Sequence, residues 1–353
     1  MAAPAEDTEA LARHIKAWAR ELGFQAAGIA DPDLGADEAR LLAWLDAGRH
    51  GEMHYMQRHG LKRSRAGLLH PGTVRVISVR MDYLPRDAAP AEAVLADPCL
   101  AYVSRYALGR DYHKLVRRRL QKLADRIEKA VGPFSYRVFT DSAPVLEKPL
   151  ARAAGLGWIG KHTNLLHRDA GSWFFLGEIY TDLPLPADEP VSDHCGTCRA
   201  CMDACPTGAI VAPYELDARL CISYLTIELR GSIPEPLRPL VGNRIFGCDD
   251  CQLVCPWNRY ADRSGEADFS PRHGLDASSL AALFRWSEDE FLRCTQGSAI
   301  RRIGYERWLR NIAVALGNAP GEPAVLEALE ARRAHSSPLV REHVGWALAR
   351  HGV

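Results

Sequence analysis

The chain carries no net charge, because 44 acidic residues balance 44 basic ones among its 353 residues. This absence excludes a global field that would attract nucleic acid or an anionic membrane, so any such attraction must be local. No stretch approaches the roughly 20 consecutive apolar residues of a membrane span. The N-terminal segment, MAAPAEDTEALARHIKAW, also lacks an apolar signal core and a twin-arginine pair. We therefore expect a cytoplasmic monomer with no membrane partner.

Cysteine, in contrast, is present in an ordered pattern. Eight of the ten cysteines form two runs that each end in Cys-Pro: Cys195, Cys198, Cys201 and Cys205, then Cys221, Cys248, Cys251 and Cys255. Short spacers let thiolates converge on one iron–sulfur cubane, while the fourth cysteine of such a run points to the other cluster. We therefore predict two [4Fe–4S] clusters with crossed ligands. The first uses Cys195, Cys198, Cys201 and Cys255, and the second uses Cys205, Cys221, Cys248 and Cys251.

Two other uses of these cysteines are weaker. Disulfides suit small secreted chains, whereas 353 residues with 47% hydrophobic content can build a core without them. Zinc could take two Cys-x-x-Cys pairs, but structural zinc sites do not need interleaved quartets. The spare cysteines, Cys99 and Cys294, are expected to be small buried hydrophobes.

Periodicity predicts three regions: a mixed α/β region at 1–185, a cluster module at 186–265 and a helical region at 266–353. The predicted helices and strands of the first region are a helix near 11–22, strands at 24–30, 74–83, 134–140, 164–167 and 173–180, and a helix at 115–131. The segment GSIPEPLRP is too rich in proline for regular structure. Helices near 280–284, 303–316 and 340–349 resemble HEAT-type repeats, and we expect them to pack on the body.

Polar residues outside the cysteines gather in three segments of the first region. In SRYALGRDYH, residues 104–113, Asp111 is expected to cap the next helix. Asp141 follows a strand, and ligands bind at the carboxyl ends of strands in open α/β sheets. Its segment could equally cap a helix opened by Ser142 and Pro144. The glycines of AGLGWIGK, residues 154–161, would let a large planar ligand approach the backbone, and we expect no Rossmann nucleotide site there.

Several long blocks occur in an order that resembles the epoxyqueuosine reductase family. They are SRYALGRDYH, DSAPVLEKPLARAAGLGWIGKHTNLL, GSWFFLGEIYTD, CGTCRACMDACPTGAI, CISYLTIE and GCDDCQLVCPWN. The resemblance implies reduction of epoxyqueuosine to queuosine at the wobble position of tRNA, with two [4Fe–4S] clusters, cobalamin and an external donor of the flavodoxin or ferredoxin type. It also implies an α+β, multidomain fold: a nitroreductase-like cobalamin domain, a bacterial-ferredoxin-like module and a HEAT-like C-terminus.

The resemblance also assigns roles to residues. Asp141 would donate a proton to the departing oxygen, and burial beside the corrin would have to raise its pKa. The residues implied around cobalamin are Arg63, Ser104, Tyr106, Asp141, Lys161, Thr163, Ser172 and Ser223. Some relatives carry cysteine where Ser104 stands, so no cobalt-side role of that cysteine is expected here. No DxHxxG motif occurs, so a histidine replacing the lower axial base is not indicated.

Two other function classes use some of the same parts. A cobalamin-dependent reductive dehalogenase acts on small halogenated compounds and usually carries a twin-arginine signal, which is missing here. An electron carrier would need only residues 190–262, and the well over 100 residues before them argue against it.

Local positive charge indicates where tRNA would bind. Residues 110–129 contain eight basic side chains against three acidic ones, and residues 293–310 contain five against one. Such runs are usually solvated helix faces, but a tRNA-modifying enzyme must also hold phosphates. We predict that the tail patch contacts the anticodon arm, with Arg117–Arg119 as a second candidate. The tail patch consists of Arg301, Arg302, Arg307 and Arg310.

Overall fold

A four-stranded sheet forms the centre of the first region. The computed structural model describes residues 5–353. The sheet has the order β1 (Ala26–Ala30), β2 (Arg75–Asp82), β7 (Phe174–Thr181) and β4 (Tyr136–Phe139). Every neighbouring pair is antiparallel. The strands therefore lie where the sequence predicts them, within a region of mixed α/β structure as expected.

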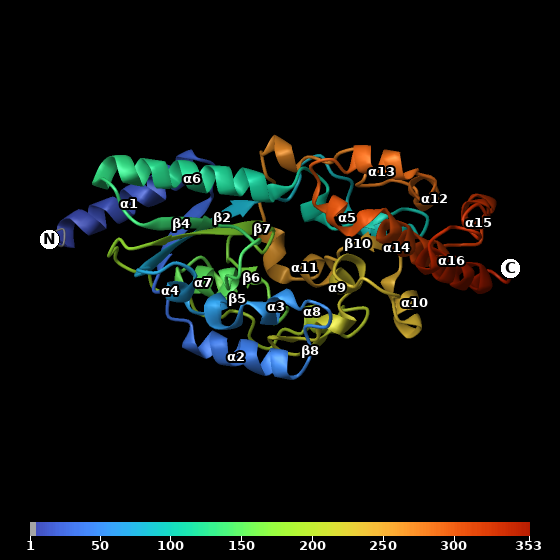
Figure 1. The fold of residues 1–353 in the computed structure, drawn as a ribbon, viewed down its shortest axis with the longest axis horizontal. Coiled ribbons are helices and arrows are strands. Elements are labelled where there is room, and N and C mark those ends of the chain that lie inside the picture. Colours follow the sequence, from blue (N-terminus) through green and yellow to red (C-terminus); the bar gives the residue numbers. More distant parts are fainter. Residues whose placement is uncertain (1–4) are drawn as a thin grey trace.

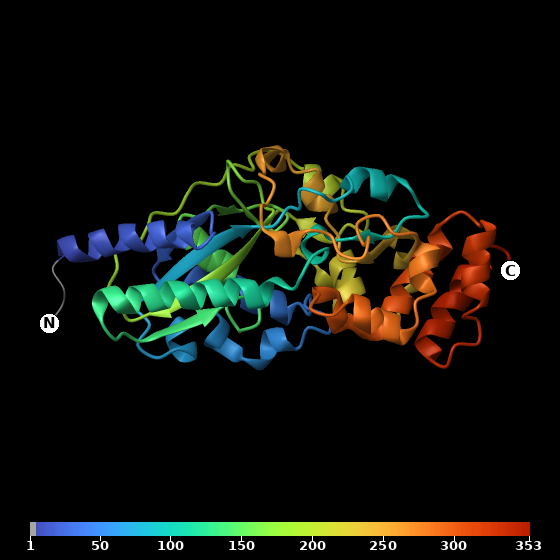
Figure 2. The same cartoon turned by 90° about the horizontal axis from the view of Figure 1, so that it is seen from above.

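Helices cover both faces of this sheet, as Figure 1 shows. On one face α1 (Ala5–Glu21) and α6 (Tyr112–Val131) enclose a core with Ile77 and Val79, and Figure 2 shows the two helices side by side. On the other face α7 (Glu147–Ala153) packs in a core with Val76. The strand β2 is consequently buried over nearly its whole length.

The helix α6 begins and ends as predicted. The carboxylate of Asp111 accepts the backbone N–H of His113 at 3.0 Å, so Asp111 is the expected N-cap. At the other end Gly132 adopts φ 85°, a left-handed conformation that glycine reaches without steric cost. This helix places Tyr112 and His113 at its first turn, close to the end of the sheet.

The cluster module lies between the sheet and the C-terminal helices (Figure 1). Its short helices α8 (Ala200–Asp203) and α11 (Asp250–Leu253), one from each cysteine run, pack against each other. A third helix, α9 (Ile222–Ile227), follows Cys221. The prediction that the proline-rich segment lacks regular structure is wrong. It forms a 3-10 turn at Glu235–Leu237 and the helix α10 (Arg238–Val241). Proline fits there because it occupies the first turn of each, where its missing N–H is not needed.

The C-terminal region is helical and shares its core with the rest of the chain. Its helices are α12 (Leu280–Phe284), α13 (Glu288–Cys294), α14 (Gly304–Asn318), α15 (Pro323–Glu330) and α16 (Pro338–Arg350). Their core includes Val103 of β3 (Tyr102–Val103) and Phe246 of β10 (Arg244–Phe246), two strands that pair in parallel. The prediction that the tail packs on the body is therefore confirmed.

The remaining elements are short, apart from α2. They are α2 (Gly35–Asp46), α3 (Tyr55–Arg58), α4 (Ala66–Leu69), α5 (Ala91–Ala96), β5 (Trp158–Ile159), β6 (Leu165–Leu166), β8 (Ile210–Ala212) and β9 (Glu215–Leu216), with 3-10 turns at Gly60–Arg63, Arg105–Ala107, Ala218–Leu220, Pro256–Tyr260, Ala267–Phe269 and Ala299–Ile303. Within the described part of the chain, no helix combines the length and apolarity that crossing a membrane requires.

Buried polar side chains of α14 join the tail to the cluster module. Arg310 is completely buried. Its guanidinium donates to the carbonyls of Leu229 at 2.8 Å, Gly231 at 2.7 Å and Leu225 at 2.7 Å. Neighbouring Asn311 is also buried and bonds to carbonyls of the module. The placement of Arg310 on the RNA-binding surface is therefore wrong, because a buried guanidinium cannot reach a phosphate.

We expect Arg310→Met to lower the free energy of unfolding by about 2–5 kcal/mol, because several buried carbonyls lose their donor. Denaturant unfolding of the purified variant measures this change. Arg301→Met is the matched control, since Arg301 is exposed and its replacement should cost less than about 0.5 kcal/mol. Equal stability of the two variants would show that these hydrogen bonds do not hold the tail in place.

Candidate active site and cluster cavities

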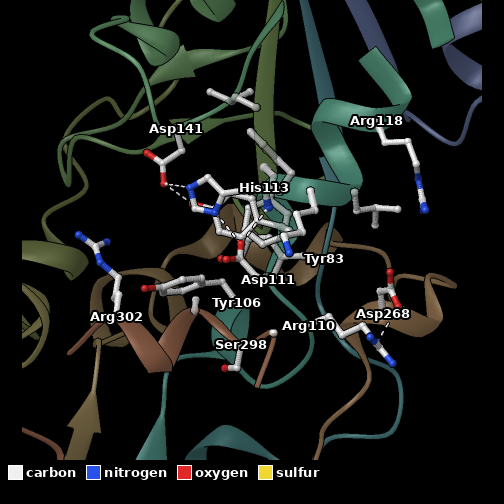
Figure 3. A pocket seen from close by; sticks show the side chains of 18 of the residues that line it. Tyr83, Tyr106, Arg110, Asp111, His113, Arg118, Asp141, Asp268, Ser298 and Arg302 are labelled. Atoms are coloured by element: carbon white, nitrogen blue, oxygen red, sulfur yellow. Dashed lines mark hydrogen bonds and ion pairs between the residues drawn. The ribbon is translucent and has the colours of Figure 1, made fainter. Parts of the chain in front are cut away.

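The largest cavity described here, of about 920 Å³, lies where the three regions meet. Aromatic side chains from β2, the turn after β3, α6 and β7 form part of its lining, and several cations stand around it (Figure 3). The aromatic residues are Tyr83, Tyr106, Tyr112, Phe174 and Phe175, and the basic ones include Arg110, Lys114, Arg118, Lys148, Arg301 and Arg302. The volume is at the upper end of the usual range for ligand pockets. Such a lining suits a large ligand with apolar faces and an anionic or polar periphery.

Asp141 stands at the wall of this cavity on the loop that follows β4. Its backbone has φ 48°, which is uncommon for a residue with a side chain. The carboxylate accepts a hydrogen bond from the hydroxyl of Tyr112 and lies 3.5 Å from Nε2 of His113. The helix-cap alternative is wrong, because α7 begins at Glu147 and has no side-chain cap. The strained loop instead aims the carboxylate at the cavity (Figure 3).

His113 lies between two carboxylates. Its Nδ1 is 2.6 Å from Asp111 and its Nε2 faces Asp141. Burial by itself lowers the pKa of His113, but the hydrogen bonds and charges of the two carboxylates outweigh it and raise the pKa to about 9. Burial would raise the pKa of Asp141, yet the hydrogen bonds from His113 and Tyr112 hold it below its usual range. The expected raised pKa of Asp141 is therefore wrong, and near neutral pH the proton resides on His113.

A second pair of carboxyls supports the Asp141 loop from behind. Glu147 accepts the backbone N–H of Asp141. Its neighbour Glu178, on β7, is completely buried, and among the described residues no donor reaches either of its carboxyl oxygens. Burial, with the adjacent charge of Asp141, raises the pKa of Glu147 to about 8, and burial beside Glu147 raises the pKa of Glu178 well above its usual value. Glu178 has no donor and adjoins Glu147, so the pair is stable only when it holds a proton.

Four of the predicted ligands line a separate cavity of about 210 Å³: Cys195, Cys198, Cys201 and Cys255. Cys255 belongs to the second run, so the structure brings together the crossed quartet. The cavity wall also includes Lys161 and His162 from the first region. Cys198 is exposed, which places this cavity at the protein surface.

None of the other four predicted ligands is exposed, and we call them the deeper quartet. Cys221 and Cys248 both pack on one apolar core. Burial raises the pKa of the Cys251 thiol, and the nearby Cys221 and Cys205 raise it further. The backbone N–H of Ala209 points to the sulfur of Cys205 at 3.3 Å. Cys205 and Cys221 thus both lie near Cys251, as a second quartet requires, and Cys201 of the first quartet is also near.

The spacing of the cysteines suits a cubane better than zinc. Among residues 5–353, no three His, Cys, Asp or Glu side chains converge as the ligands of one metal ion would. A mononuclear zinc site requires that convergence. In a cubane each thiolate binds a different iron atom, so the ligands surround a larger volume.

The cavity beside Asp141 includes three of the eight residues implied around cobalamin, which are Tyr106, Asp141 and Ser172. The five that do not line it are Arg63, Ser104, Lys161, Thr163 and Ser223. Lys161 lines the cysteine cavity instead, where Nζ donates to the carbonyls of Gly196 at 2.6 Å and Cys198 at 2.8 Å.

The other four residues bond within the protein. The buried hydroxyl of Ser104 donates to Asp249, and the buried guanidinium of Arg63 donates to the carbonyl of Tyr55 at 3.2 Å. Ser223 donates to the carbonyl of Cys248 at 3.5 Å. The carbonyl of Thr163 accepts a hydrogen bond from Lys148 at 3.1 Å.

The tail patch divides into two pairs. Arg301 and Arg302 line the large cavity. Arg302 is half-exposed and pairs with Glu228 at 2.8 Å. Arg307 donates to the carbonyls of Ile303 at 2.6 Å and Ile227 at 2.9 Å, and thus acts like the buried Arg310 as a structural link. The charge run does not show these differences, because neighbouring positions on a helix face different sides.

The second basic candidate, Arg117–Arg119, divides in the same way. Arg117 and Arg118 border a shallow surface pocket, and Arg118 also lines the large cavity. Arg119 instead forms an ion pair with Glu266. Two of the three guanidiniums are therefore positioned to meet a phosphate.

The glycine-rich segment serves packing rather than ligand approach. Gly155, Gly157 and Gly160 have the letter spacing of a nucleotide fingerprint, but the segment runs from α7 into β5 rather than from a strand into a helix. A Cβ at Gly157 would lie 2.1 Å from the carbonyl oxygen of Leu166, and one at Gly155 would lie 2.7 Å from that of Glu189. The expectation of a planar ligand there is therefore wrong.

Cys99 and Cys294 are half-buried, not buried as expected.

Sequence reasoning missed His113, Glu147 and Glu178 as parts of the site. All three lie within blocks that carry the family resemblance. A histidine two residues after an N-cap aspartate was a signal for His113, since the cap fixes that residue at the helix start. The position of Glu178, fully buried on a central strand, has no comparable signal in a single sequence.

Comparison with known proteins defines the class and then the family. Residues 194–258 match the 4Fe-4S double cluster binding domain, so the class is an iron–sulfur oxidoreductase. Residues 63–142 match the family model described as epoxyqueuosine reductase QueG, DUF1730. The epoxyqueuosine reductase of Pseudomonas aeruginosa is 66% identical over 98% of this chain and 96% of its own length. That of Escherichia coli is 62% identical over 97% and 90%. The chain therefore belongs to the epoxyqueuosine reductase family.

Solved structures agree with this assignment. An epoxyqueuosine reductase crystallised with a tRNA-Tyr epoxyqueuosine-modified stem loop has a TM-score of 0.89 and 28% identity, over 98% of this chain and 91% of that one. The epoxyqueuosine reductase of Bacillus subtilis, with its catalytic loop swung out of the active site, has a TM-score of 0.86 and 27% identity, over 97% and 90%.

Proposed function

We propose that this chain reduces epoxyqueuosine to queuosine at the wobble position of tRNA. The observation that carries the proposal is the identity of 66% over nearly the whole length of a curated epoxyqueuosine reductase. The structural likeness to an epoxyqueuosine reductase bound to a modified stem loop supports it. The reductive dehalogenase and electron-carrier alternatives are not favoured, since the resemblance covers all three regions.

The electrons would come from two [4Fe–4S] clusters held by the crossed cysteine quartets. The surface quartet would receive each electron from an external low-potential donor of the flavodoxin or ferredoxin type, because Cys198 is exposed. Cys251 of the deeper quartet directly precedes Gln252, which lines the large cavity, so this quartet would pass the electrons on to that cavity. Removal of the epoxide oxygen consumes two electrons and two protons and releases water, so the one-electron carriers must deliver twice in each turnover.

The large cavity is the site that we assign to cobalamin and to the modified base. Tyr106, Ser172 and Asp141 line it and would contact the corrinoid or the base, and its aromatic lining suits flat apolar surfaces. When bound, cobalamin supplies a cobalt centre that accepts single electrons and is strongly nucleophilic once reduced. We keep Arg63, Ser104, Thr163 and Ser223 as predicted neighbours outside the cavity lining.

Asp141 and His113 would handle the protons at the departing oxygen. The imidazolium of His113 would carry the proton, and Asp141 at the cavity wall would pass that proton to the departing oxygen. Glu147 holds the loop through the backbone N–H of Asp141, so that the carboxylate stays aimed at the cavity. A carboxylate–imidazolium pair thus replaces the lone protonated acid that the family resemblance suggests.

We also propose the finer architecture and setting. The three units are a nitroreductase-like region at 1–185, a bacterial-ferredoxin-like module at 186–265 and a HEAT-like region at 266–353. Since the tail core includes Val103 and Phe246, these units are not expected to fold separately. We expect the protein to act as a cytoplasmic monomer.

The direct test incubates the reduced holoprotein with tRNA that carries epoxyqueuosine, digests the tRNA and measures nucleoside masses. The proposal predicts loss of one oxygen from epoxyqueuosine. An unchanged nucleoside with fully loaded, reduced protein would refute the proposed function.

In the same assay we expect Asp141→Asn to retain cobalamin and both clusters but to lose about 10²–10⁴-fold in turnover, the usual cost of removing one acid–base group. His113 is protonated below its pKa of about 9, so the wild-type rate should fall as pH rises through about 9. His113→Asn should remove that pH dependence. Wild-type rates in Asp141→Asn would return this residue to a purely structural role.

The double variant Arg301→Ala/Arg302→Ala should weaken tRNA binding and lower the slope of log affinity against log salt, by roughly one unit per lost phosphate contact. Arg293→Ala, on the nearby helix α13 and outside the cavity lining, is the control and should leave the slope unchanged. An unchanged slope in the double variant would place the RNA surface elsewhere, with Arg117 and Arg118 the next candidates.

A further inference from the structure

The surface cysteine cavity has one wall that comes from outside the cluster module. The segment from Trp158 to His162, which includes β5, closes over it from the first region. Lys161 fastens this segment through hydrogen bonds to the carbonyls of Gly196 and Cys198. The ligand loop and the covering segment are therefore held together by the protein itself.

His162 in this wall has a proton donor without a partner. The side chain is only 4% exposed. Its Nδ1 accepts the backbone N–H of Asn164 at 3.1 Å, which fixes the ring proton on Nε2. Among the described residues nothing accepts a hydrogen bond from that Nε2. A buried donor left unsatisfied destabilises the folded protein, so an acceptor is expected in the cavity that the ring lines.

Trp158 shows the same feature independently. The side chain is 2% exposed, and within residues 5–353 its Nε1 lacks an oxygen or nitrogen acceptor. The indole packs in the apolar cluster that contains Cys255 and Cys195. Two donors without an oxygen or nitrogen acceptor thus lie against cysteines of the same quartet.

We propose that Trp158 and His162 donate hydrogen bonds to sulfur atoms of the cluster in this cavity and thereby raise its reduction potential. The inference rests on the proposed function, which places a [4Fe–4S] cluster there. Reduction adds negative charge to the cluster, and N–H donors stabilise that charge. Outer residues that bond to metal ligands commonly tune metal sites in this way. The two residues would keep the surface cluster reducible by a donor protein.

The surroundings of the deeper quartet are different. The sulfur of Cys248 lies 2.7 Å from a carboxylate oxygen of Asp250, and the neighbouring Asp249 is buried. Negative charge near a cluster makes its reduction harder. The two clusters should therefore respond separately, and a change at His162 should alter only one potential.

The test is a redox titration of the holoprotein followed by EPR, with two substitutions that separate the ring nitrogens. His162→Asn can still accept the Asn164 N–H, as asparagine does in Asx turns, but has no donor at the Nε2 position. His162→Gln reaches that position with an amide N–H. We expect a more negative midpoint for one cluster in His162→Asn, no change in the other cluster, and a midpoint near that of the wild type in His162→Gln.

His167→Asn is the matched control. The Nδ1 of His167 accepts the N–H of Asp169 at 3.2 Å in the same local pattern, but the ring does not line the cavity. Its replacement should leave both midpoints unchanged. Trp158→Phe keeps an aromatic ring, removes the N–H and should lower the same midpoint as His162→Asn. It therefore tests the proposed hydrogen bonds even if His162→Asn does not take up both clusters.

Unchanged midpoints in His162→Asn and Trp158→Phe with both clusters present would overturn the inference. Equal shifts in His162→Asn and His162→Gln would also overturn it, because they would reflect packing rather than the donor. Absence of two [4Fe–4S] signals in the unaltered protein is a separate outcome. It would refute the proposed cofactors, and this inference with them.

Discussion

The crossing of the two cysteine runs is the constraint on which the rest of the structure depends. Cys255, from the end of the second run, lines the surface cavity with three cysteines of the first. Cys205, from the end of the first run, is near Cys221 and Cys251. This crossing brings α8 and α11 together. Arg310 then fixes α14 to the carbonyls around α9, so that the tail borders the large cavity.

The proton chemistry follows from how the sheet ends rather than from burial alone. The loop after β4 delivers Asp141 to the first turn of α6, where His113 and Tyr112 bond to it. These partners favour the carboxylate more than burial disfavours it. The stored proton is therefore on the histidine, which burial alone would have left neutral. The Glu147–Glu178 pair, of which Glu178 is completely buried, supports the loop from behind.

Local patterns predicted much of the fold, and spatial relations explain what they missed. Alternation and apolar runs located the strands and α6, and Cys-Pro spacing indicated the crossed quartets, of which the first lines one cavity. Strand direction could not be predicted, because β2 is covered on both faces. The burial of Arg310 was equally hidden, since its carbonyl partners lie about 80 residues away. The glycines of residues 154–161 wrongly suggested a site for a planar ligand, because Gly157 packs against the backbone of Leu166 instead.

The crossed quartets are tested most directly by counting clusters in Cys255→Ser. Iron analysis and EPR of the anaerobically purified variant should show that the surface cluster is lost or damaged while the deeper cluster survives. Cys99→Ser, outside both quartets, should retain two clusters and serves as the control. Two intact clusters in Cys255→Ser would contradict the crossed assignment.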